Sequence, residues 1–216
     1  DHNWVPDHRV KYVSRLPRDP WWLCGPRFAL LAGAYRGAGR YRFHDAVRSI
    51  GIFMGGTDAA NVSMLAWRAL RESLGFRGAI EIATTSGNPN LPALREVASR
   101  DAGTQIVLDQ PDLAAFFARH DLQIGAGGGA TWERCCIGAP TLAVIAADNQ
   151  RPVLLPLQSM GVLRVLADEP PSQAAIAAAA RELIENPALR RSLAERATAL
   201  VDGLGATRVA TALLAP

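Results

Sequence analysis

A glycine-rich turn followed closely by a carboxylate is the feature of this sequence best suited to chemistry. The stretch Gly125–Glu133 (GAGGGATWE) follows an apolar run from Leu122 to Ile124 and opens a segment with a helical pattern. Glycines at such a turn let main-chain N–H groups approach an anion, and a helix start directs free donors and partial positive charge at it. Glu133, one turn in, can accept hydrogen bonds from hydroxyls such as those of a ribose. The combination predicts a nucleotide site, although glycine also serves strand–helix turns for steric reasons alone.

The elements that must position this turn alternate regularly from residue 49 onward. Apolar runs predict strands at 49–54, 80–84, 106–108, 122–125 and 141–145, with an edge strand at 163–166. Intervening patterns predict helices at 59–73, 91–100, 112–119, 130–137 and 152–160, and a helical tail over 172–186 and 188–214 with breaks at Pro187, Gly203 and Gly205. This alternation predicts an α/β fold, a Rossmann-like parallel sheet with helices on both faces. Residues 1–48, interrupted by prolines, show no clear period.

Ligands of such sheets gather at the carboxyl ends of the strands. The predicted loops there are 55–58, 85–90, 109–112, 125–131 and 146–151, and four of the five are rich in Gly, Asn, Asp, Ser or Thr. In the first, a tight turn and phosphate contact by main-chain amides are equally good interpretations, and Asp58 is expected to cap the next helix. Asn88 and Asn90 are expected to shape a turn.

Asn149 and Gln150 carry side-chain amides that both donate and accept hydrogen bonds, which suits the N-acetyl and hydroxyl groups of a sugar. The residues alone fit a second interpretation equally well, in which both bind their own loop backbone.

Composition narrows the possible classes of protein. The 216 residues are 49% hydrophobic and 20% charged, which is typical of a globular chain. The longest apolar run, Ile137–Ala147, is too short to cross a bilayer, and the polar first residues do not resemble a signal peptide. The three cysteines, Cys24, Cys135 and Cys136, match no metal spacing and are expected to be free thiols in the cytoplasm. The pI of about 9.1 comes from dispersed arginines, so nucleic acid is not the expected partner. A membrane partner and a cofactor are not expected either.

The histidines and tryptophans are expected to have structural roles and not catalytic ones. His2, His8, His44 and His120 have no spacing for metal or triad chemistry, and the first two are expected to be solvated. Trp132 is expected in the core, and Trp21–Trp22 at a contact between domains.

Several motifs together resemble one enzyme family. They are FMGGTD (53–58), ATTSGNPNL (83–91), GAGGGATWERCCIGAP (125–140) and DNQ (148–150). They resemble the UDP-sugar hydrolase of pseudaminic acid biosynthesis, which acts on UDP-2,4-diacetamido-2,4,6-trideoxy-β-L-altropyranose, and GPRFALL (25–31) resembles its interdomain region. That family has a GT-B-like fold of two Rossmann-type domains and is related to the glycosyltransferase that makes the lipid II disaccharide. The resemblance runs from Leu23 onward and reaches only the C-terminal domain of the GT-B-like fold.

The resemblance implies a division of the chain and a reaction. Residues 1–48 would be a remnant of the N-terminal domain with the interdomain segment, and 49–216 a nucleotide-sugar-binding domain. The reaction would be hydrolysis of the anomeric C–O bond between UDP and an N-acetylated sugar, with helix-start amides stabilising the departing UDP. The general base is a histidine of the N-terminal domain, which has no counterpart here, so turnover by this chain alone is expected to be weak or absent.

The resemblance also implies roles for individual residues. Leu108 would read the uracil edge through its backbone, and Asn149 would lie near the reacting centre as a catalytic group that orients the sugar or the attacking water. The predicted sugar-binding residues are Asn149 and Gln150. The predicted UDP-binding residues are Gly55, Gly56, Thr57, Leu108, Gly127, Gly128, Gly129, Thr131 and Glu133. No metal is implied.

Three alternatives stay open at this point. The chain would equally serve as the nucleotide-binding half of a GT-B glycosyltransferase, or as a non-catalytic nucleotide-sugar-binding remnant. In the latter case the exposed interdomain face would bind the missing N-terminal domain or drive self-association. A dinucleotide-dependent enzyme fits poorly, because Gly125, Gly127, Gly128 and Gly129 do not give the expected G-x-G-x-x-G after the first strand.

Overall fold

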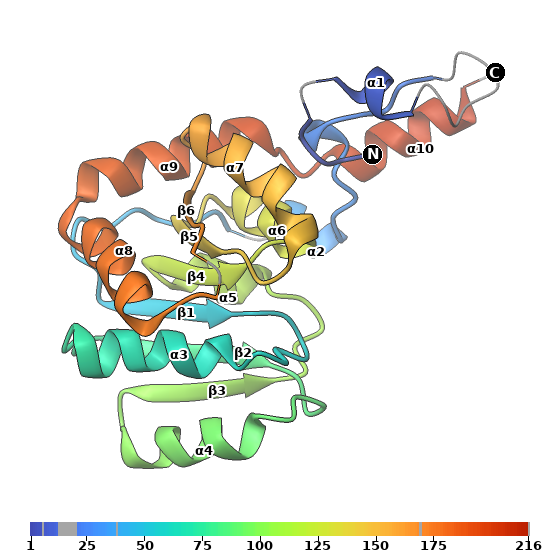
Figure 1. The fold of residues 1–216 in the computed structure, drawn as a ribbon. Coiled ribbons are helices and arrows are strands. Elements are labelled where there is room, and N and C mark those ends of the chain that lie inside the picture. Colours follow the sequence, from blue (N-terminus) through green and yellow to red (C-terminus); the bar gives the residue numbers. More distant parts are fainter. Residues whose placement is uncertain (6, 13–20, 38, 169, 216) are drawn as a thin grey trace.

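The structure is a computed structural model of the chain and describes residues 1–5, 7–12, 21–37, 39–168 and 170–215. Its centre is a six-stranded sheet in which every neighbouring pair is parallel, in the order β3-β2-β1-β4-β5-β6 (Figure 1). The strands are β1 (Ser49–Phe53), β2 (Ala79–Thr84), β3 (Thr104–Leu108), β4 (Leu122–Ala126), β5 (Thr141–Val144) and β6 (Arg164–Leu166). The predicted α/β, Rossmann-like class is confirmed. Successive strands are added on one side of β1 and then on the other, so the topological switch point lies between β1 and β4.

Helices cover both faces of this sheet, as the sequence predicts. One face carries α3 (Val62–Arg68), its continuation as a π-helical turn (Ala69–Ser73), α4 (Leu91–Arg100) and α8 (Gln173–Glu185). The other carries α5 (Ala114–Arg119), α6 (Gly129–Ile137), α7 (Arg151–Ser159), which follows a short 3-10 turn (Asp148–Gln150), and α9 (Pro187–Leu200).

Each face has its own apolar core. Ile50, Ile52 and Leu94 are among the fully buried side chains under the first set of helices. Phe117 and Trp132 are buried under the second, as expected for Trp132. Cys135 and Cys136 are buried and Cys24 is half-buried, and all three are free thiols, as expected. The two cores hold the strands rigidly, so that the carboxyl-end loops project from a fixed edge.

The N-terminal segment packs with the last helix instead of joining the sheet. It contains α1 (His8–Tyr12), a 3-10 turn (Pro26–Phe28) and α2 (Gly33–Gly37). The helix α10 (Gly205–Leu214) rests on that 3-10 turn, and both lie with α1 at one end of the molecule (Figure 1). A Cβ atom on Gly205 would collide with the backbone of Ala29, so glycine permits this close approach.

Large apolar side chains are exposed in the same region. Trp21 is 71% exposed, and Leu213 and Leu214 are 76% and 84% exposed. Among the described residues, the stretch Pro187–Leu214 is long and apolar enough to cross a membrane by length and composition. The structure divides this stretch into α9 and α10 at residues 201–204.

Candidate functional site at the carboxyl edge of the sheet

The glycine turn joins β4 to α6 and leaves the start of that helix open. Gly128, immediately before α6, has φ 95°, a left-handed conformation that favours glycine. Within the described residues, no side chain caps the first turn of α6, and Gly128 and Gly129 are exposed. The turn closes on itself through Thr131 N–H, which donates to Gly128 O at 3.0 Å. The start of this nine-residue helix is therefore exposed and has no side-chain cap, as an anion-binding site requires.

One peptide unit of this turn is held from both sides. Nη2 of Arg134 donates to the carbonyl oxygen of Ala126 at 2.6 Å, and the N–H of Gly127 donates to Oε1 of Gln150 at 3.2 Å. The same oxygen of Gln150 accepts from Ala146 N at 3.0 Å, which ties the β4 and β5 loops together. Oε1 of Gln150, a predicted sugar-binding residue, thus serves the loop, and its Nε2 group is the part available for a sugar.

The turn after β1 lies beside this one, because β1 and β4 are neighbours in the sheet. Gly55 has φ 90°, and the carbonyl of Gly56 accepts from Thr85 Oγ1 at 2.8 Å. Thr57 is exposed. Phosphate contact by the N–H groups of this turn stays a prediction.

Asp58 is the cap of the helix that follows, as expected. Its two carboxylate oxygens accept from Val62 N and Ser63 N, each at 2.9 Å. The predicted helix start at Ala59 is wrong, because Asp58 and Asn61 both have positive φ and turn the chain before α3 begins at Val62. The first amides of α3 are committed to Asp58 and are not free for a ligand.

The β2 and β3 loops complete the edge. Asn88 shapes the predicted turn: its Nδ2 donates to Thr84 Oγ1 at 2.8 Å and its Oδ1 accepts from Asn90 N at 2.8 Å. Asn90 in turn donates to Asp58 O at 3.0 Å. Leu108 ends β3, and its carbonyl accepts from Gln110 Nε2 at 3.1 Å.

Glu133 lies on α6 with a tyrosine that the sequence did not reveal. The hydroxyl of Tyr35, on α2, accepts from Leu113 N at 3.1 Å and lies within hydrogen-bonding reach of the Glu133 carboxyl group. Burial raises the pKa of Glu133, and the Tyr35 hydrogen bond opposes that rise. Glu133 is thus a half-buried acceptor held in place by the N-terminal segment. Tyr35 belongs to a stretch without periodicity (GAYRG), so no sequence signal marks it.

Asn149 is exposed within the 3-10 turn that precedes α7. The structure therefore brings the predicted residues to one edge, in the loops after β1, β3, β4 and β5. Among the described residues, no group of His, Cys, Asp and Glu is arranged to hold a metal ion.

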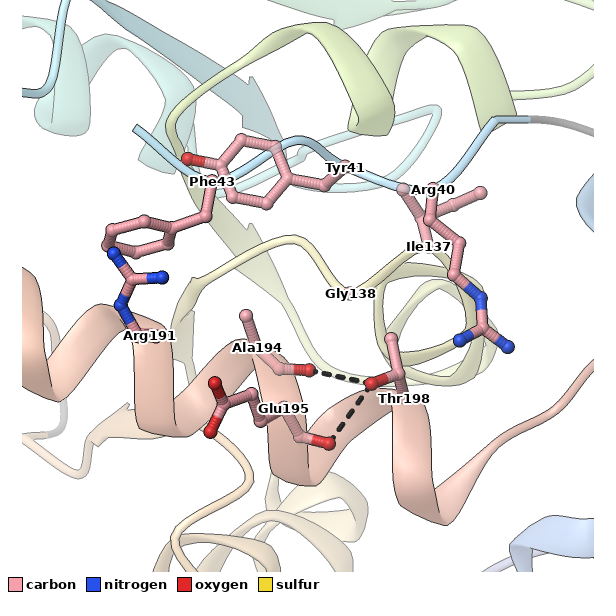
Figure 2. A pocket seen from close by; sticks show the side chains of 9 residues that line it. All are labelled: Arg40, Tyr41, Phe43, Ile137, Gly138, Arg191, Ala194, Glu195 and Thr198. Atoms are coloured by element: carbon pink, nitrogen blue, oxygen red, sulfur yellow. Dashed lines mark hydrogen bonds between the residues drawn. The ribbon is translucent and has the colours of Figure 1, made fainter. Parts of the chain in front are cut away.

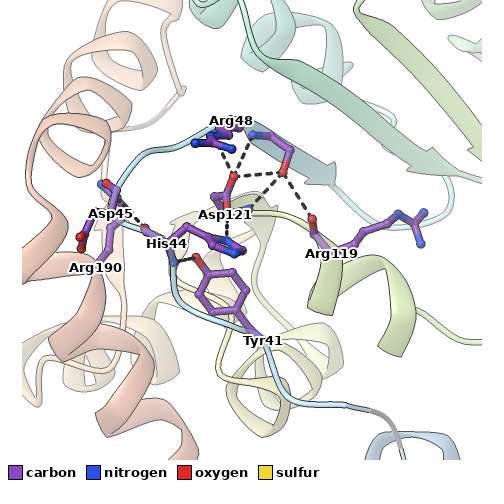
Figure 3. A network of polar contacts seen from close by, with 8 residues as sticks. Tyr41, His44, Asp45, Arg48, Arg119, Asp121 and Arg190 are labelled. Atoms are coloured by element: carbon purple, nitrogen blue, oxygen red, sulfur yellow. Dashed lines mark hydrogen bonds and ion pairs between the residues drawn. The ribbon is translucent and has the colours of Figure 1, made fainter.

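The opposite, amino edge carries carboxylates that are paired with neighbouring polar groups. His44 Nδ1 lies 2.8 Å from Asp121 Oδ1, and Asp121 Oδ2 accepts from Arg48 N and Ser49 N at 2.8 and 3.0 Å (Figure 3). His120 Nε2 lies 2.9 Å from Glu81 Oε2. These contacts tie the start of β1 to its neighbours, so we assign them to the fold.

The histidine predictions need correction in part. His44 and His120 both have carboxylate partners, which lie 77 and 39 residues away in sequence and could not be recognised from spacing. His2 is only partly solvated: it is half-buried, its ring packs edge-on against Trp132 with centroids 6.2 Å apart, and burial lowers its pKa. Nε2 of His8 lies 2.8 Å from Asn3 O.

A pocket of about 200 Å³ lies between the chain around Tyr41, the C-terminal end of α6 and α9 (Figure 2). Arg191 stacks on Phe43 there, with Cζ 4.1 Å from the ring centroid. Because a helix C-terminus carries partial negative charge, this end of α6 is less suited to a phosphate than its beginning.

Comparison with known proteins agrees with the fold. No protein-family model matches the chain. The spore coat polysaccharide biosynthesis protein SpsG of Bacillus subtilis (strain 168) is 26% identical over 194 residues, which cover 88% of this chain and 57% of that protein. The chain thus spans little more than half the length of this curated relative.

Three solved structures are similar at low identity. MurG of Acinetobacter baumannii matches with a TM-score of 0.64 and 16% identity, over 96% of this chain and 63% of that one. Spinosyn rhamnosyltransferase SpnG, complexed with spinosyn aglycone, matches with a TM-score of 0.60 and 20% identity, over 94% of this chain and 60% of that one. UDP-GlcNAc 2-epimerase from Neisseria meningitidis, bound to UDP-GlcNAc, matches with a TM-score of 0.62 and 16% identity, over 80% of this chain and 46% of that one. The chain therefore shares the Rossmann-like α/β fold of these structures, which include GT-B-like glycosyltransferases.

Proposed function

We propose that this chain binds UDP or a UDP-sugar at the carboxyl edge of its sheet. The observation that carries the proposal is the open start of α6, where the amides of exposed Gly128 and Gly129 stand one turn from the carboxylate of Glu133. The diphosphate binds these amides and the Gly55–Thr57 turn, beside Gly127 and Thr131, whose own amides hold the turn in shape. The ribose hydroxyls bind Glu133. The uracil lies at the end of β3 beside Leu108. UDP-GlcNAc bound to the similarly folded Neisseria epimerase supports this class of ligand.

The reaction we propose is hydrolysis of the anomeric C–O bond of a UDP-sugar with N-acetyl groups, in nonulosonic (pseudaminic) acid biosynthesis. Negative charge grows on UDP as it leaves, and outward-facing amides stabilise such charge. Asn149 is exposed next to Gln150, where its amide can orient the sugar or the attacking water. The described residues at this edge include no histidine placed as a general base, so the proposal assigns the base to another domain or chain.

A GT-B glycosyltransferase is the second candidate, because it needs the same nucleotide half. The fold shared with spinosyn rhamnosyltransferase SpnG favours it. An NMR assay of UDP-sugar turnover discriminates the two: the hydrolase releases UDP into water without an acceptor, whereas the transferase forms a product only when an acceptor sugar is added. A non-catalytic nucleotide-sugar binder would do neither.

The exposed apolar surface around Trp21, Leu213 and Leu214 is the proposed partner face. A groove of about 460 Å³ between Phe28 and α10 continues it. We propose that it meets a second α/β domain or, in its absence, a second copy of this chain. Sedimentation of the isolated chain tests the latter, and a monomer at all concentrations contradicts self-association.

Isothermal titration calorimetry with UDP tests the nucleotide site. We expect binding by the unaltered chain and a loss of about tenfold or more in E133A, because two ribose hydroxyls lose their acceptor. The matched control is E96A, which removes an exposed helical glutamate on α4 that pairs with Arg100. No heat with millimolar UDP, or equal binding by E133A, would overturn the assignment.

A further inference from the structure

Arg134 is a buried guanidinium group whose surroundings satisfy it only in part. It lies on α6 and is 1% exposed. Nη2 donates to the Ala126 carbonyl, but Nε and Nη1 are buried without a hydrogen-bond partner in the part of the chain that the structure describes. Burial lowers the pKa of Arg134 to about 10, so the group stays charged at neutral pH. Because an unpaired buried charge opposes folding, stability alone does not account for an arginine here.

The position of the guanidinium group gives it a second role. A Cβ atom on Gly125 would collide with Nη1 of Arg134 and would also meet the carbonyl oxygen of Phe53, the last residue of β1. On its other side, Cζ lies 5.8 Å from the centroid of the Phe117 ring. Arg134 thus fills the space between the ends of β4 and β1, at the switch point and next to the glycine turn that follows β4.

We propose that Arg134 is a positioning residue for the diphosphate of the bound nucleotide, an inference that rests on the proposed function. It keeps the Ala126 carbonyl turned inward, so that this oxygen does not repel a phosphate and the amides after it point outward. Its charge also adds positive potential at the turn, and low-dielectric surroundings screen that potential only weakly. The ligand does not touch it.

Arg190 on α9 is the internal comparison. It is equally buried, at 0% exposure, and its Nε is also unpartnered. Its other two nitrogens, however, bind four carbonyl oxygens, those of Leu183, Ile184, His44 and Asp45. All of its paired donors hold backbone together near the amino edge, which is a structural role. Arg134 instead holds one carbonyl, and that carbonyl belongs to the glycine turn.

The test compares UDP with uridine, which lacks the diphosphate. Titration calorimetry is performed on the unaltered chain, on R134K, which keeps the charge, and on R134Q, which removes the charge but keeps a donor for Ala126. We expect R134Q to lose about tenfold in UDP affinity while its uridine affinity changes less than about twofold, and R134K to keep most of the UDP preference. R190Q, the matched control, should keep both affinities and melt at a lower temperature.

Each other outcome counts against the inference. An unchanged ratio of UDP to uridine affinity in R134Q would overturn it, as would an equal loss for both ligands, which indicates general disruption of the site. R134M is the second neutral variant. If neither R134Q nor R134M folds, Arg134 is needed for the free protein itself and the inference is wrong. Failure of the unaltered chain to bind UDP would instead overturn the proposed function.

Discussion

Arg134 and Gln150 hold opposite ends of a single peptide unit, the one that joins Ala126 to Gly127. The carbonyl of that unit accepts from Arg134 Nη2, and its N–H donates to Gln150 Oε1. In a trans peptide these two groups point in opposite directions, so the two side chains fix the orientation of its plane. The clamp prepares the turn before any ligand arrives, and preorganisation of this kind favours binding.

Removing one side of the clamp is expected to weaken nucleotide binding. In Q150A the N–H groups of Gly127 and Ala146 lose their acceptor, and we expect UDP affinity to fall about fivefold or more by calorimetry. Q158A is the matched control, because Gln158, on α7, accepts from Val165 N at 2.7 Å through its Oε1 and lies away from the turn. Equal UDP affinities in Q150A and Q158A would contradict the role of the clamp.

Uridine binding should depend on the ionisation of Glu133. The carboxylate form accepts hydrogen bonds from the ribose, and burial raises its pKa, so affinity should fall as the pH drops through this raised value. Uridine is the probe because it has no phosphate to titrate. E133Q should bind weakly and without this pH dependence. An unchanged titration in E133Q would show that another group is responsible.

Tyr35 should tune that titration. In Y35F the hydroxyl that lowers the pKa of Glu133 is lost, so the midpoint of uridine binding should move to higher pH. Leu113 N–H also loses its acceptor, which should lower the free energy of unfolding by about 1 kcal/mol. Y12F, which removes an exposed hydroxyl bonded to Asp1, is the control. An unchanged midpoint in Y35F would show that Tyr35 does not act on the Glu133 carboxyl group.

Asn149 should matter for the sugar and not for the nucleotide. Its side chain is exposed, so N149A should keep the stability and the UDP affinity of the unaltered chain. We expect its affinity for a UDP-N-acetylhexosamine to fall about fivefold, the effect of one or two lost hydrogen bonds. Calorimetry with both ligands gives the comparison, and parallel changes for UDP and UDP-sugar would place Asn149 outside the sugar site.

Glu81 should make the fold sensitive to acid. Burial tends to raise its pKa, but hydrogen bonds from His120 and Arg119 outweigh burial and lower it to about 2. A carboxyl pKa that is lower in the folded state stabilises the fold at pH values above about 4.5, the pKa of this group in the unfolded chain. This stability is lost as the pH falls from there toward 2. Over that pH interval, the free energy of unfolding measured with urea should therefore fall by about 2 kcal/mol in the unaltered chain relative to E81Q. Parallel pH profiles would contradict this.

The sequence predicted the architecture well because its signals are local. Buried strands and amphipathic helices leave a pattern within ten or fifteen residues, and the edge strand at Arg164–Leu166 was visible in this way. The glycine turn and Asp58 were also visible, because glycine and a capping carboxylate have local conformational roles. The helix boundary at Val62 was missed, since two non-glycine residues with positive φ have no clear signature.

The contacts that the sequence could not predict join distant segments. Tyr35 meets Leu113 from 78 residues away, and the partners of His44 and His120 are brought together only by the order of the strands. Arg134 follows Glu133 in sequence as an ordinary helical arginine. Its burial between two strand ends depends on Gly125 and Phe53, which pairing of β1 with β4 places side by side.

The last helix offers a way to observe the arrival of a partner. Gly205 is the one buried residue of α10. Most of the α10 backbone is therefore protected from solvent by little more than the hydrogen bonds of the helix. Amide protons there should exchange with deuterium within minutes in the lone chain and far more slowly once another surface covers the helix. Exchange rates in α10 thus measure assembly separately from nucleotide binding, which takes place at the carboxyl edge of the sheet.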